Sequence, residues 1–366
     1  MIHAPGAPSP TPEPWGSSAT LAEIADRLAR AKRIAVLTHS KPDGDAIGSS
    51  LALARALIHT GKSVRQGGDG GGVVVATPLY LGPWPSRFDP LIPPTRIVQE
   101  HHACWSEPGL IDADAVAIVD TGSWNQVADA RPYIEAHRDV TVVIDHHPHG
   151  DGDIAPVRHV DPSAAAAAEL IAVVAMRLLG IDSARKLPRD VAEPLYLGIA
   201  TDTGWFKYPS TTSRTLRLAA DLMDAGVDAD RLFQMSEQGD TPARLRLIQK
   251  ALSSLKLIDH DRAAIMCLSK ADFAEAGASD DEYGGIIDLP KAVGTVRAIV
   301  LLTELEPGLT KASFRSKASL TGNDEVDVNL LAQRFNGGGH KHAAGAKIRM
   351  PIGEAADAIA RALTGA

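Results

Sequence analysis

A carboxylate and two imidazoles follow one short apolar segment of the chain. The segment 142–144 reads Val-Val-Ile, and Asp145, His146 and His147 come directly after it. A run of β-branched residues is typical of an inner strand in a parallel sheet. Side chains just beyond such a strand lie at the sheet edge where open α/β folds bind their ligands. Carboxylate oxygen and imidazole nitrogen suit manganese, iron or zinc, so the segment predicts a metal site.

Three further apolar segments, 34–37, 115–119 and 191–200, also lead into acidic or imidazole side chains. The first two read as strands, and the third fits either a strand or a helix. The residues that follow these segments are His39, Asp43, Asp45, Asp120 and Asp202. For Asp43 and Asp45 the alternative role is to form a turn and cap the helix predicted from Ala46 to Ile58.

Five carboxylates would meet at one sheet edge if these segments lie side by side. Carboxylates at that density repel each other, and bound divalent cations would offset the repulsion. Two metal ions about 3.5–4 Å apart form a known arrangement for in-line displacement at phosphorus. The residue set therefore predicts a two-metal phosphoryl hydrolase.

Two other segments offer groups for substrate binding. Residues 335–345 read Phe-Asn-Gly-Gly-Gly-His-Lys-His-Ala-Ala-Gly. In this segment Gly338 and Gly339 would let backbone amides form a nest for phosphate, and His340 would add charge. A tight structural turn is the alternative. Phe206, which follows Asp202 in an aromatic cluster, would either stack a base or pack against the sheet edge.

The length and composition of the chain exclude several classes of protein. The chain has 366 residues, a formal charge of −8 and 45% hydrophobic residues. The length is enough for two domains. The negative charge argues against a protein that binds long nucleic acid by charge alone. The two cysteines are far apart, so no disulfide framework is expected and the cytoplasm is the predicted compartment. No apolar segment is long enough to predict a membrane span.

The pattern of apolar segments predicts an α/β protein with two domains. Residues 1–18, rich in Pro, Gly and Ser, read as a disordered tail, and Pro78–Pro94 reads as an irregular surface segment. The segment Asp161-Pro162-Ser163 is expected to cap an alanine-rich helix that ends near Leu179. Strands of the second domain are expected at 263–268, 296–304 and 309–316. The expected order is a parallel-sheet catalytic domain with helices on both faces (19–235), a helical linker (236–256) and a smaller α/β domain (257–366), with a cleft between the two domains.

The ordered set of motifs resembles the DHH phosphoesterase family. His-x3-Asp-x-Asp begins at His39, Asp120 follows a strand, Asp-His-His begins at Asp145, and Asp202 comes last. The Gly-Gly-Gly-His segment is similar to that of the C-terminal substrate-binding domain in one branch of the family. The resemblance covers residues 20 to 350. Within that branch, the compact size resembles the bifunctional oligoribonucleases that also dephosphorylate pAp.

The resemblance implies a role for each of these residues. One metal ion would be bound by His39, Asp43 and Asp120. A second would be bound by Asp45, Asp120, His146 and Asp202. Asp145 would support the cluster, and His147 would face the scissile phosphate. The groups that hold the rest of the substrate would be Arg315, Gly338, Gly339 and His340. The family implies two manganese ions, with magnesium or cobalt as substitutes, and a homodimer.

The expected activity is hydrolysis of very short RNA or linear dinucleotides to 5′-mononucleotides, and of pAp to AMP. The alternatives are a cyclic-dinucleotide phosphodiesterase, a pyrophosphatase or polyphosphatase, and a non-catalytic nucleotide-binding module. The Gly-Gly-Gly-His segment disfavours the pyrophosphatase, and the complete set of metal-ligand positions disfavours the non-catalytic module. The segment Gly67–Glu107 and His342 depart from the family pattern, which leaves the substrate preference open.

Overall fold

The computed structural model describes residues 14–66, 74–99, 112–280, 282–317 and 325–364. The chain divides into two units, Met1–Gly239 and Asp240–Ala366, between α7 (Ala229–Glu237) and α8 (Pro242–Ser253). Leu247 and Ala251 of α8 belong to the core of the second unit. The segment predicted as a linker therefore contributes a core helix to that unit. Among the helices of the described residues, none has both the length and the hydropathy needed to span a membrane.

Six strands form the sheet of the first unit, and all neighbouring pairs in it are parallel. Their spatial order is β3-β2-β1-β4-β5-β6. The strands are β1 (Arg33–Leu37), β2 (Val75–Tyr80), β3 (Val98–Gln99), β4 (Ala115–Val119), β5 (Thr141–Asp145) and β6 (Val157–Val160). Leu37 of β1 pairs with Ile118, and Val119 of β4 pairs with Ile144. The carboxyl ends of the three strands expected from the sequence therefore lie at the same edge.

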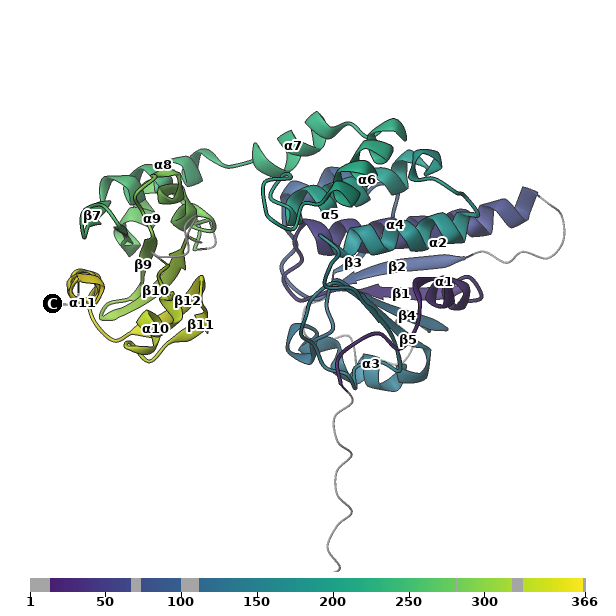
Figure 1. Ribbon diagram of the computed structural model, residues 1–366, viewed down its shortest axis with the longest axis horizontal. Coiled ribbons are helices and arrows are strands. Elements are labelled where there is room, and N and C mark those ends of the chain that lie inside the picture. Colours follow the sequence, from purple (N-terminus) through teal and green to yellow (C-terminus); the bar gives the residue numbers. More distant parts are fainter. Residues whose placement is uncertain (1–13, 67–73, 100–111, 281, 318–324, 365–366) are drawn as a thin grey trace, which may run out of the picture. The chain divides into compact units, whose positions relative to one another are not determined.

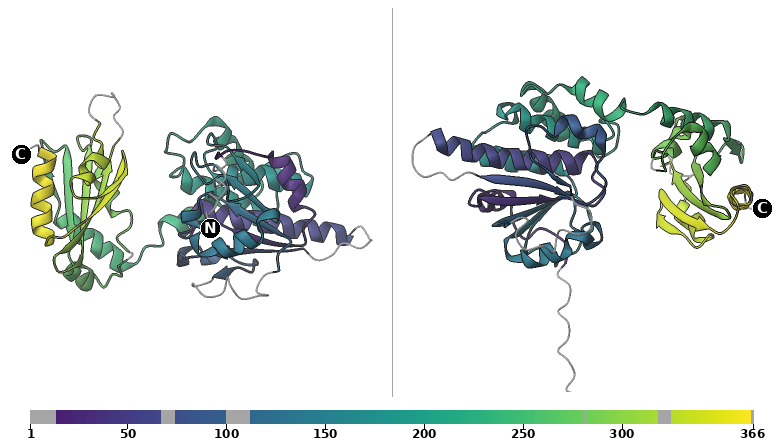
Figure 2. Two further views of the ribbon diagram at one scale, coloured as in Figure 1. Left: turned by 90° about the horizontal axis from the view of Figure 1, so that it is seen from below. Right: turned by 180° about the vertical axis from the view of Figure 1, so that it is seen from behind.

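Apolar side chains cover both faces of this sheet. Along β1, Ile34 and Val36 belong to one core and Ala35 and Leu37 to the other, as the alternation of a strand requires. One face is covered by α1 (Leu21–Leu28), α2 (Gly44–Gln66), α4 (Ala167–Leu179) and α5 (Arg189–Asp202), with α6 (Ser213–Asp224) packed on α5. The other face is covered by α3 (Arg131–Ala136) (Figures 1 and 2). The predicted α/β fold with helices on both faces is confirmed.

Part of the proline-rich segment is a strand. Pro78, which was expected in an irregular surface segment, lies in β2 and pairs with Val36. The neighbouring strand β3 pairs only with Leu79 and Tyr80, so at Pro78 the strand is an edge strand, where proline is tolerated. The chain then forms the 3-10 helix η1 (Ser86–Leu91). Residues 67–73 and 100–107 of the segment Gly67–Glu107 lie outside the described residues.

Two helices differ from the sequence-based expectation. The segment 191–200, which fitted a strand or a helix, lies in α5, so Asp202 ends a helix and does not follow a strand. The prediction that Asp161 caps α4 is wrong, because the helix begins only at Ala167 and the Asp161 carboxylate accepts hydrogen bonds from Ser163. The first amides of α4 are bound instead by Asp45, a residue far away in the sequence.

The second unit contains a six-stranded sheet with the order β11-β12-β10-β9-β8-β7. Its strands are β7 (Lys256–Ile258), β8 (Ala263–Leu268), β9 (Ala298–Glu306), β10 (Leu309–Ser316), β11 (Gly338–His340) and β12 (Ala343–Ile348). The pair β8 and β9 is parallel, and the other neighbouring pairs are antiparallel. Helices α8 and α9 (Lys270–Ala276) pack on one face, and α10 (Val328–Gln333) and α11 (Ile352–Thr364) pack on the other.

The glycine-rich segment forms the edge strand β11. A Cβ on Gly337 would lie 2.2 Å from a carbonyl oxygen of β12, and one on Gly339 would lie 2.5 Å from another. Glycine at these positions therefore lets β11 approach β12 closely. At Gly338 an added Cβ would meet no atom closer than 3.8 Å, so packing does not require glycine there. The predicted amide nest is wrong for this segment, because successive amides of a strand point in opposite directions.

Residues 14–18 lie along the edge strand β6. The amide of Ser18 donates to the carbonyl oxygen of Arg158 at 2.8 Å, and the hydroxyl of Ser17 donates to that of Val160 at 3.0 Å. The predicted disordered tail over residues 1–18 is therefore wrong for residues 14–18, because the open edge of the sheet supplies hydrogen-bond partners. Residues 1–13 lie outside the described residues.

Candidate metal centre and active site

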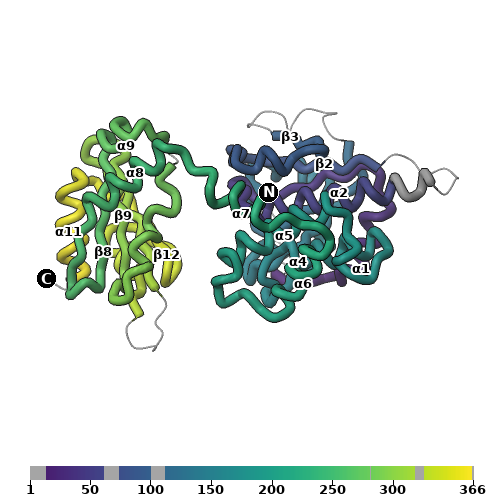
Figure 3. The backbone as a smooth tube through the Cα atoms, turned by 90° about the horizontal axis from the view of Figure 1, so that it is seen from above, coloured from purple at the N-terminus to yellow at the C-terminus, as the bar shows by residue number. Residues whose placement is uncertain are grey.

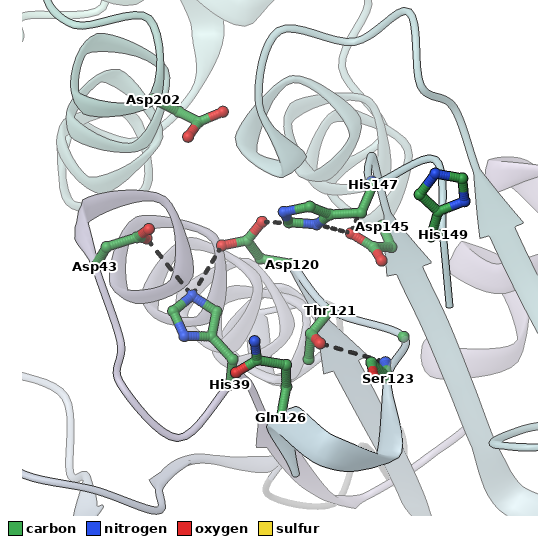
Figure 4. A pocket seen from close by; sticks show the side chains of 11 residues that line it. His39, Asp43, Asp120, Thr121, Ser123, Gln126, Asp145, His147, His149 and Asp202 are labelled. Atoms are coloured by element: carbon green, nitrogen blue, oxygen red, sulfur yellow. Dashed lines mark hydrogen bonds and ion pairs between the residues drawn. The ribbon is translucent and has the colours of Figure 1, made fainter. Parts of the chain in front are cut away.

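A pocket of about 320 Å³ opens at the carboxyl edge of the first sheet (Figure 4). Six of the residues predicted from the sequence line it: His39, Asp43, Asp120, Asp145, His147 and Asp202. They come from the ends of β1, β4 and β5, from the start of α2 and from the end of α5. Segments that are far apart in the sequence therefore meet in this pocket.

Asp120 lies between two groups of acidic and imidazole side chains. It follows β4 with a backbone φ of +59°, in the left-handed region that Asp tolerates better than most residues. Its Oδ2 lies 3.5 Å from Nε2 of His39, and its Oδ1 lies 3.4 Å from Nε2 of His146. One carboxylate thus faces both groups, as a ligand shared between two cations would.

The first group consists of His39, Asp43 and Asp120, whose ligand atoms lie within 4.8 Å of one another. Nε2 of His39 is 3.7 Å from Oδ1 of Asp43. This oxygen also accepts hydrogen bonds from the amides of Asp45 and Ala46 at 3.0 and 3.1 Å, so Asp43 caps the start of α2. Capping and metal binding are compatible, because a carboxylate has lone pairs for several partners.

The second group consists of Asp45, His146 and Asp202, again with ligand atoms within 4.8 Å of one another. Nε2 of His146 lies 4.0 Å from Oδ2 of Asp45 and 3.6 Å from Oδ2 of Asp202. Asp45 is 1% exposed, and its carboxylate accepts hydrogen bonds from the amides of Ala167 and Ala168 at 2.6 and 3.0 Å. Asp45 therefore joins the start of α4 to this group.

Asp202 reaches the second group because α5 packs closely on α2. A Cβ on Gly48 of α2 would lie 2.3 Å from the carbonyl oxygen of Pro194 in α5. One on Gly198 of α5 would lie 2.7 Å from Oδ1 of Asp45. Glycine at these two positions lets the helix backbones approach, which brings the end of α5 to the pocket. Figure 3 shows α5 beside α4 and α6 in this helical layer.

Asp145 orients the imidazole of His147 at the wall of the pocket. Asp145 is fully buried, and its Oδ1 accepts hydrogen bonds from the amides of His146 and His147 at 2.7 and 3.1 Å. Nδ1 of His147 lies 2.8 Å from the same oxygen. The ring of His147 is also near the metal groups, because its ligand atom lies within 4.8 Å of those of Asp120 and His146.

Both histidines that face Asp120 have raised pKa values. Burial acts to lower the pKa of His39, but its hydrogen bonds to Asp120 and Asp43 raise that pKa to about 10. Burial also acts to lower the pKa of His146, but its hydrogen bond to Asp120 and the charge of Asp45 raise it to about 10. Without bound cations, protons on these imidazoles balance part of the negative charge of the pocket.

The carboxylates of the second group also bind protons more tightly than usual. Burial and the charges of Asp120 and Asp202 raise the pKa of Asp45 well above its ordinary range. Burial raises the pKa of Asp202 to about 6. Shifts in this direction indicate carboxylates that lack enough positive charge beside them. The donor set of oxygen and imidazole nitrogen fits divalent cations, which would supply that charge.

Metal binding is expected to release protons. At neutral pH the imidazoles of His39 and His146 are protonated in the metal-free protein, since each pKa is about 10, and each must lose its proton to bind a cation. Binding should release about two protons, so the apparent affinity should rise roughly 100-fold per pH unit through neutrality. Titration calorimetry in two buffers with different ionisation enthalpies measures this release. Equal heats in both buffers would contradict it.

Most of the chain is similar in sequence to known proteins. Residues 33–199 match the DHH family, N-terminal domain, and residues 261–365 match the DHHA1 domain. A bifunctional oligoribonuclease and PAP phosphatase, NrnA, from Thermus thermophilus is 30% identical over 343 residues, which are 93% of this chain and 91% of the relative. The chain belongs to the DHH family. Together with the acidic groups described above, this membership indicates dependence on a divalent metal.

Two further comparisons agree with this assignment. A probable bifunctional oligoribonuclease and PAP phosphatase, NrnA, from Streptococcus mutans is 28% identical over 320 residues, which are 86% of this chain and 88% of the relative. The crystal structure of an exopolyphosphatase-related protein from Bacteroides fragilis has a TM-score of 0.78 and 23% identity to this DHH family member. That match covers 94% of this chain and 95% of the other, which confirms the fold.

Trp15 of this DHH family member holds the loop that carries His147. Its indole N–H donates to the carbonyl oxygen of His147 at 3.0 Å. A Cβ on Gly122 would lie 1.7 Å from the indole ring, and one on Gly150 would lie 2.7 Å from it. Because Gly122 follows Asp120 closely in the chain, a single ring packs against the loops of both site residues. No pattern in the sequence around Trp15 indicated this contact.

Replacing Trp15 with alanine is expected to lower the free energy of unfolding by about 2 kcal/mol, roughly half the cost for a fully buried tryptophan, since this ring is half-buried. Trp15→Phe should cost only about 1 kcal/mol, because it keeps most of the packing and loses one hydrogen bond. Urea denaturation measures both values. Equal stability of the alanine variant and the wild type would mean that the segment 14–18 does not support the loop.

Three of the four predicted substrate-binding residues of the second unit share one face of its sheet. Arg315 of β10 and His340 of β11 both pair with Ala343 of β12, one from each side. Residues directly opposite each other in neighbouring strands point to the same face, so Arg315 and His340 share one face of the sheet. Gly338 lies two residues before His340 in β11 and therefore lies on that face as well. Gly339 lies on the other face. The shared face is opposite to the core that contains Phe314.

Phe206 is placed differently from the site residues. Its ring packs edge-on against Tyr196 with centroids 5.9 Å apart, beside the core of the first unit. It is not among the residues that line the pocket. The packing role considered for Phe206 therefore describes its position, and base stacking stays a prediction. His342, whose role the sequence left open, is hydrogen-bonded through Nδ1 to the hydroxyl of Ser316 at 2.8 Å.

The pocket also contains residues that the sequence analysis missed. They are Thr121, Gly122, Ser123, Gln126 and His149. The backbone carbonyl of Gln126 accepts a hydrogen bond from the amide of Ser40 at 2.8 Å, which joins two loops of the site. Residues of irregular loops have no periodic pattern to mark them. The position of His149, two residues after His147, was the one signal available.

Proposed function

We propose that this protein is a manganese-dependent hydrolase that cleaves short oligoribonucleotides and linear dinucleotides to 5′-mononucleotides, and pAp to AMP. Membership of the DHH family supports hydrolysis of phosphoester bonds. Similarity to two proteins named bifunctional oligoribonuclease and PAP phosphatase, over 88% and 91% of their lengths, supports these substrates.

The observation that carries the proposal is the position of Asp120, with one oxygen toward His39 and the other toward His146. In our proposal one cation is held by His39, Asp43 and Asp120. The other is held by Asp45, Asp120, His146 and Asp202. When bound, the two cations would supply Lewis-acid activation of the attacking water and neutralise charge on the phosphate.

His147 is the proposed proton donor to the leaving oxygen. Its Nδ1 hydrogen bond with Asp145 leaves Nε2 available to the pocket. This hydrogen bond also raises the pKa of His147, which keeps the imidazole protonated to higher pH than usual. An oriented imidazolium beside the scissile bond is a general acid, and Asp145 is the residue that positions it.

The second unit is proposed to bind the far end of the substrate. Arg315 and His340 share a sheet face on which Gly338 leaves the backbone open to a ligand. Arginine and an imidazole on such a face suit a phosphate group. A substrate as small as pyrophosphate would have no use for this surface, which argues against the pyrophosphatase alternative.

We also propose the identity of the metal ion, the oligomeric state of the protein and its cellular compartment. Mixed carboxylate and imidazole donors support manganese, with magnesium or cobalt as substitutes. A homodimer is proposed from the family resemblance alone. A cytoplasmic location is proposed because the chain has only two cysteines, far apart in its sequence.

A product profile tests the proposed function. The full-length protein with added manganese would be given pAp, pApA, cyclic di-AMP, a 5-mer RNA and pyrophosphate in parallel, and products would be separated by ion-exchange chromatography. We expect AMP from pAp and pApA at the highest rates. Preferential cleavage of cyclic di-AMP or pyrophosphate would favour those alternatives. Tight binding of pApA without hydrolysis under any divalent metal would favour a non-catalytic module.

A further inference from the structure

A second hollow adjoins the metal site within the first unit. It has a volume of about 230 Å³, and Asp43 and Asp202 line both this hollow and the site pocket. Arg87 of η1 also lines the second hollow. Arg87 also lines a third, open hollow of about 750 Å³, beside Gln234 and Gln238 of the α7 region. The three hollows therefore follow one another away from the metal site.

The segment that carries Arg87 is held firmly against the first unit. The guanidinium carbon of Arg87 lies 4.9 Å from the ring centroid of Phe88, which is fully buried. At the end of η1, the buried Arg55 of α2 donates hydrogen bonds to the carbonyl oxygens of Leu91 and Ile92. Arg87 therefore lies on a turn that the buried Phe88 and the hydrogen bonds of Arg55 hold in place.

The guanidinium of Arg87 forms no ion pair with an acidic side chain of the described residues. Its side chain is exposed, and within the described part of the chain its guanidinium has no hydrogen bond or ion pair. The other arginine of the third hollow, Arg231, is paired with Glu193 at 2.8 Å. The nearby acids are also engaged elsewhere. Asp89 accepts a hydrogen bond from Trp84 at 2.6 Å, and Glu237 accepts one from Ser236 at 3.2 Å.

We infer that Arg87 binds the phosphate that a trinucleotide adds to a dinucleotide, and that the open hollow beyond it receives the added nucleoside. The inference rests on the proposed function and assigns it a longer substrate. A guanidinium matches the geometry of a phosphate group, and a hollow of about 750 Å³ lies within the usual size of ligand sites. The amide of Gln238 can donate to and accept from a base edge, and Gln234, whose Nε2 donates to Asp230 at 2.8 Å, offers its carbonyl oxygen as an acceptor.

The test compares pApApA with pApA in the full-length protein with manganese. Arg87→Ala is expected to lower the ratio of kcat/KM on pApApA to that on pApA by about 10- to 100-fold, the factor that one charged hydrogen-bond donor contributes. Arg87→Lys should recover part of this loss, because it keeps the charge without the planar fork. Arg217→Ala is the matched control, since Arg217 is an exposed arginine of α6.

Each outcome separates the inference from the proposed function. An unchanged ratio in Arg87→Ala would overturn the inference, and so would a wild type that cleaves pApA but not pApApA. An unchanged ratio would leave the whole proposed function intact, and failure on pApApA would leave its hydrolysis of linear dinucleotides and pAp. A wild type that cleaves neither substrate would overturn the proposed function and the inference with it. Thermal unfolding of both variants completes the design, because a loss of folding would lower the rates on both substrates equally. The unchanged ratio that overturns the inference is therefore the one measured in a variant that unfolds at the wild-type temperature, Arg87→Ala or, where that variant is unstable, Arg87→Lys.

Discussion

Replacing Asp120 with alanine is expected to abolish manganese-dependent hydrolysis of pApA, with a loss of at least about a thousandfold in kcat/KM. Asp120 faces His39 with one oxygen and His146 with the other, so the change removes a ligand from both groups at once. Two divalent cations as close as about 4 Å repel each other strongly, and a carboxylate between them offsets that repulsion. The manganese bound per chain, measured by equilibrium dialysis, should fall with the activity.

The stability of the metal-free Asp120→Ala protein distinguishes loss of metal from loss of fold. In the metal-free protein Asp120 pairs with the protonated imidazoles of His39 and His146, so this variant should keep a cooperative unfolding transition at a somewhat lower temperature than the metal-free wild type. Asp182→Ala is the control, because Asp182 is an exposed residue paired with Lys186 on the surface. Full activity in Asp120→Ala, or lost activity with unchanged manganese content, would contradict the shared-ligand role.

Replacing His147 with asparagine is expected to lower kcat on pApA by about 10²- to 10⁴-fold, the usual contribution of a general acid. The bound manganese should stay the same, because the two groups that face Asp120 keep all their ligand atoms. Asp145 holds the imidazole through Nδ1 and thereby fixes the direction of Nε2, which asparagine cannot reproduce. Steady-state kinetics and dialysis on the same protein sample measure both quantities.

A substrate with a more acidic leaving group provides a second test of the proton-donor role of His147. With bis(p-nitrophenyl) phosphate the leaving oxygen needs no proton, so the loss in His147→Asn should be much smaller than with pApA. His260→Asn is a suitable control, since His260 is an exposed histidine in the turn between β7 and β8. Equal losses on the two substrates, or a fall in bound manganese, would assign His147 to metal binding and not to proton transfer.

The sequence by itself determined the part of the site that depends on strand ends. Asp120 follows β4 and Asp145 ends β5 with His146 after it, and both strands are short runs of apolar residues that read clearly from the sequence. Parallel neighbours end at the same edge of a sheet, so the side chains beyond them meet whatever the rest of the fold does. For the same reason the parallel-sheet fold of the first unit could be predicted.

Only the tertiary structure decided the contacts between segments that no local pattern links. Asp202 joins the site from the end of a helix, because Gly48 and Gly198 let α5 pack closely on α2. Arg87 lines the hollow beside the site and Trp15 contacts the loop of His147, although the composition of their segments indicated an irregular surface and a disordered tail. Periodicity reports which way one segment faces and where it ends. Which partner covers that face depends on how distant side chains fit together, and such complementarity exists only once the chain has folded.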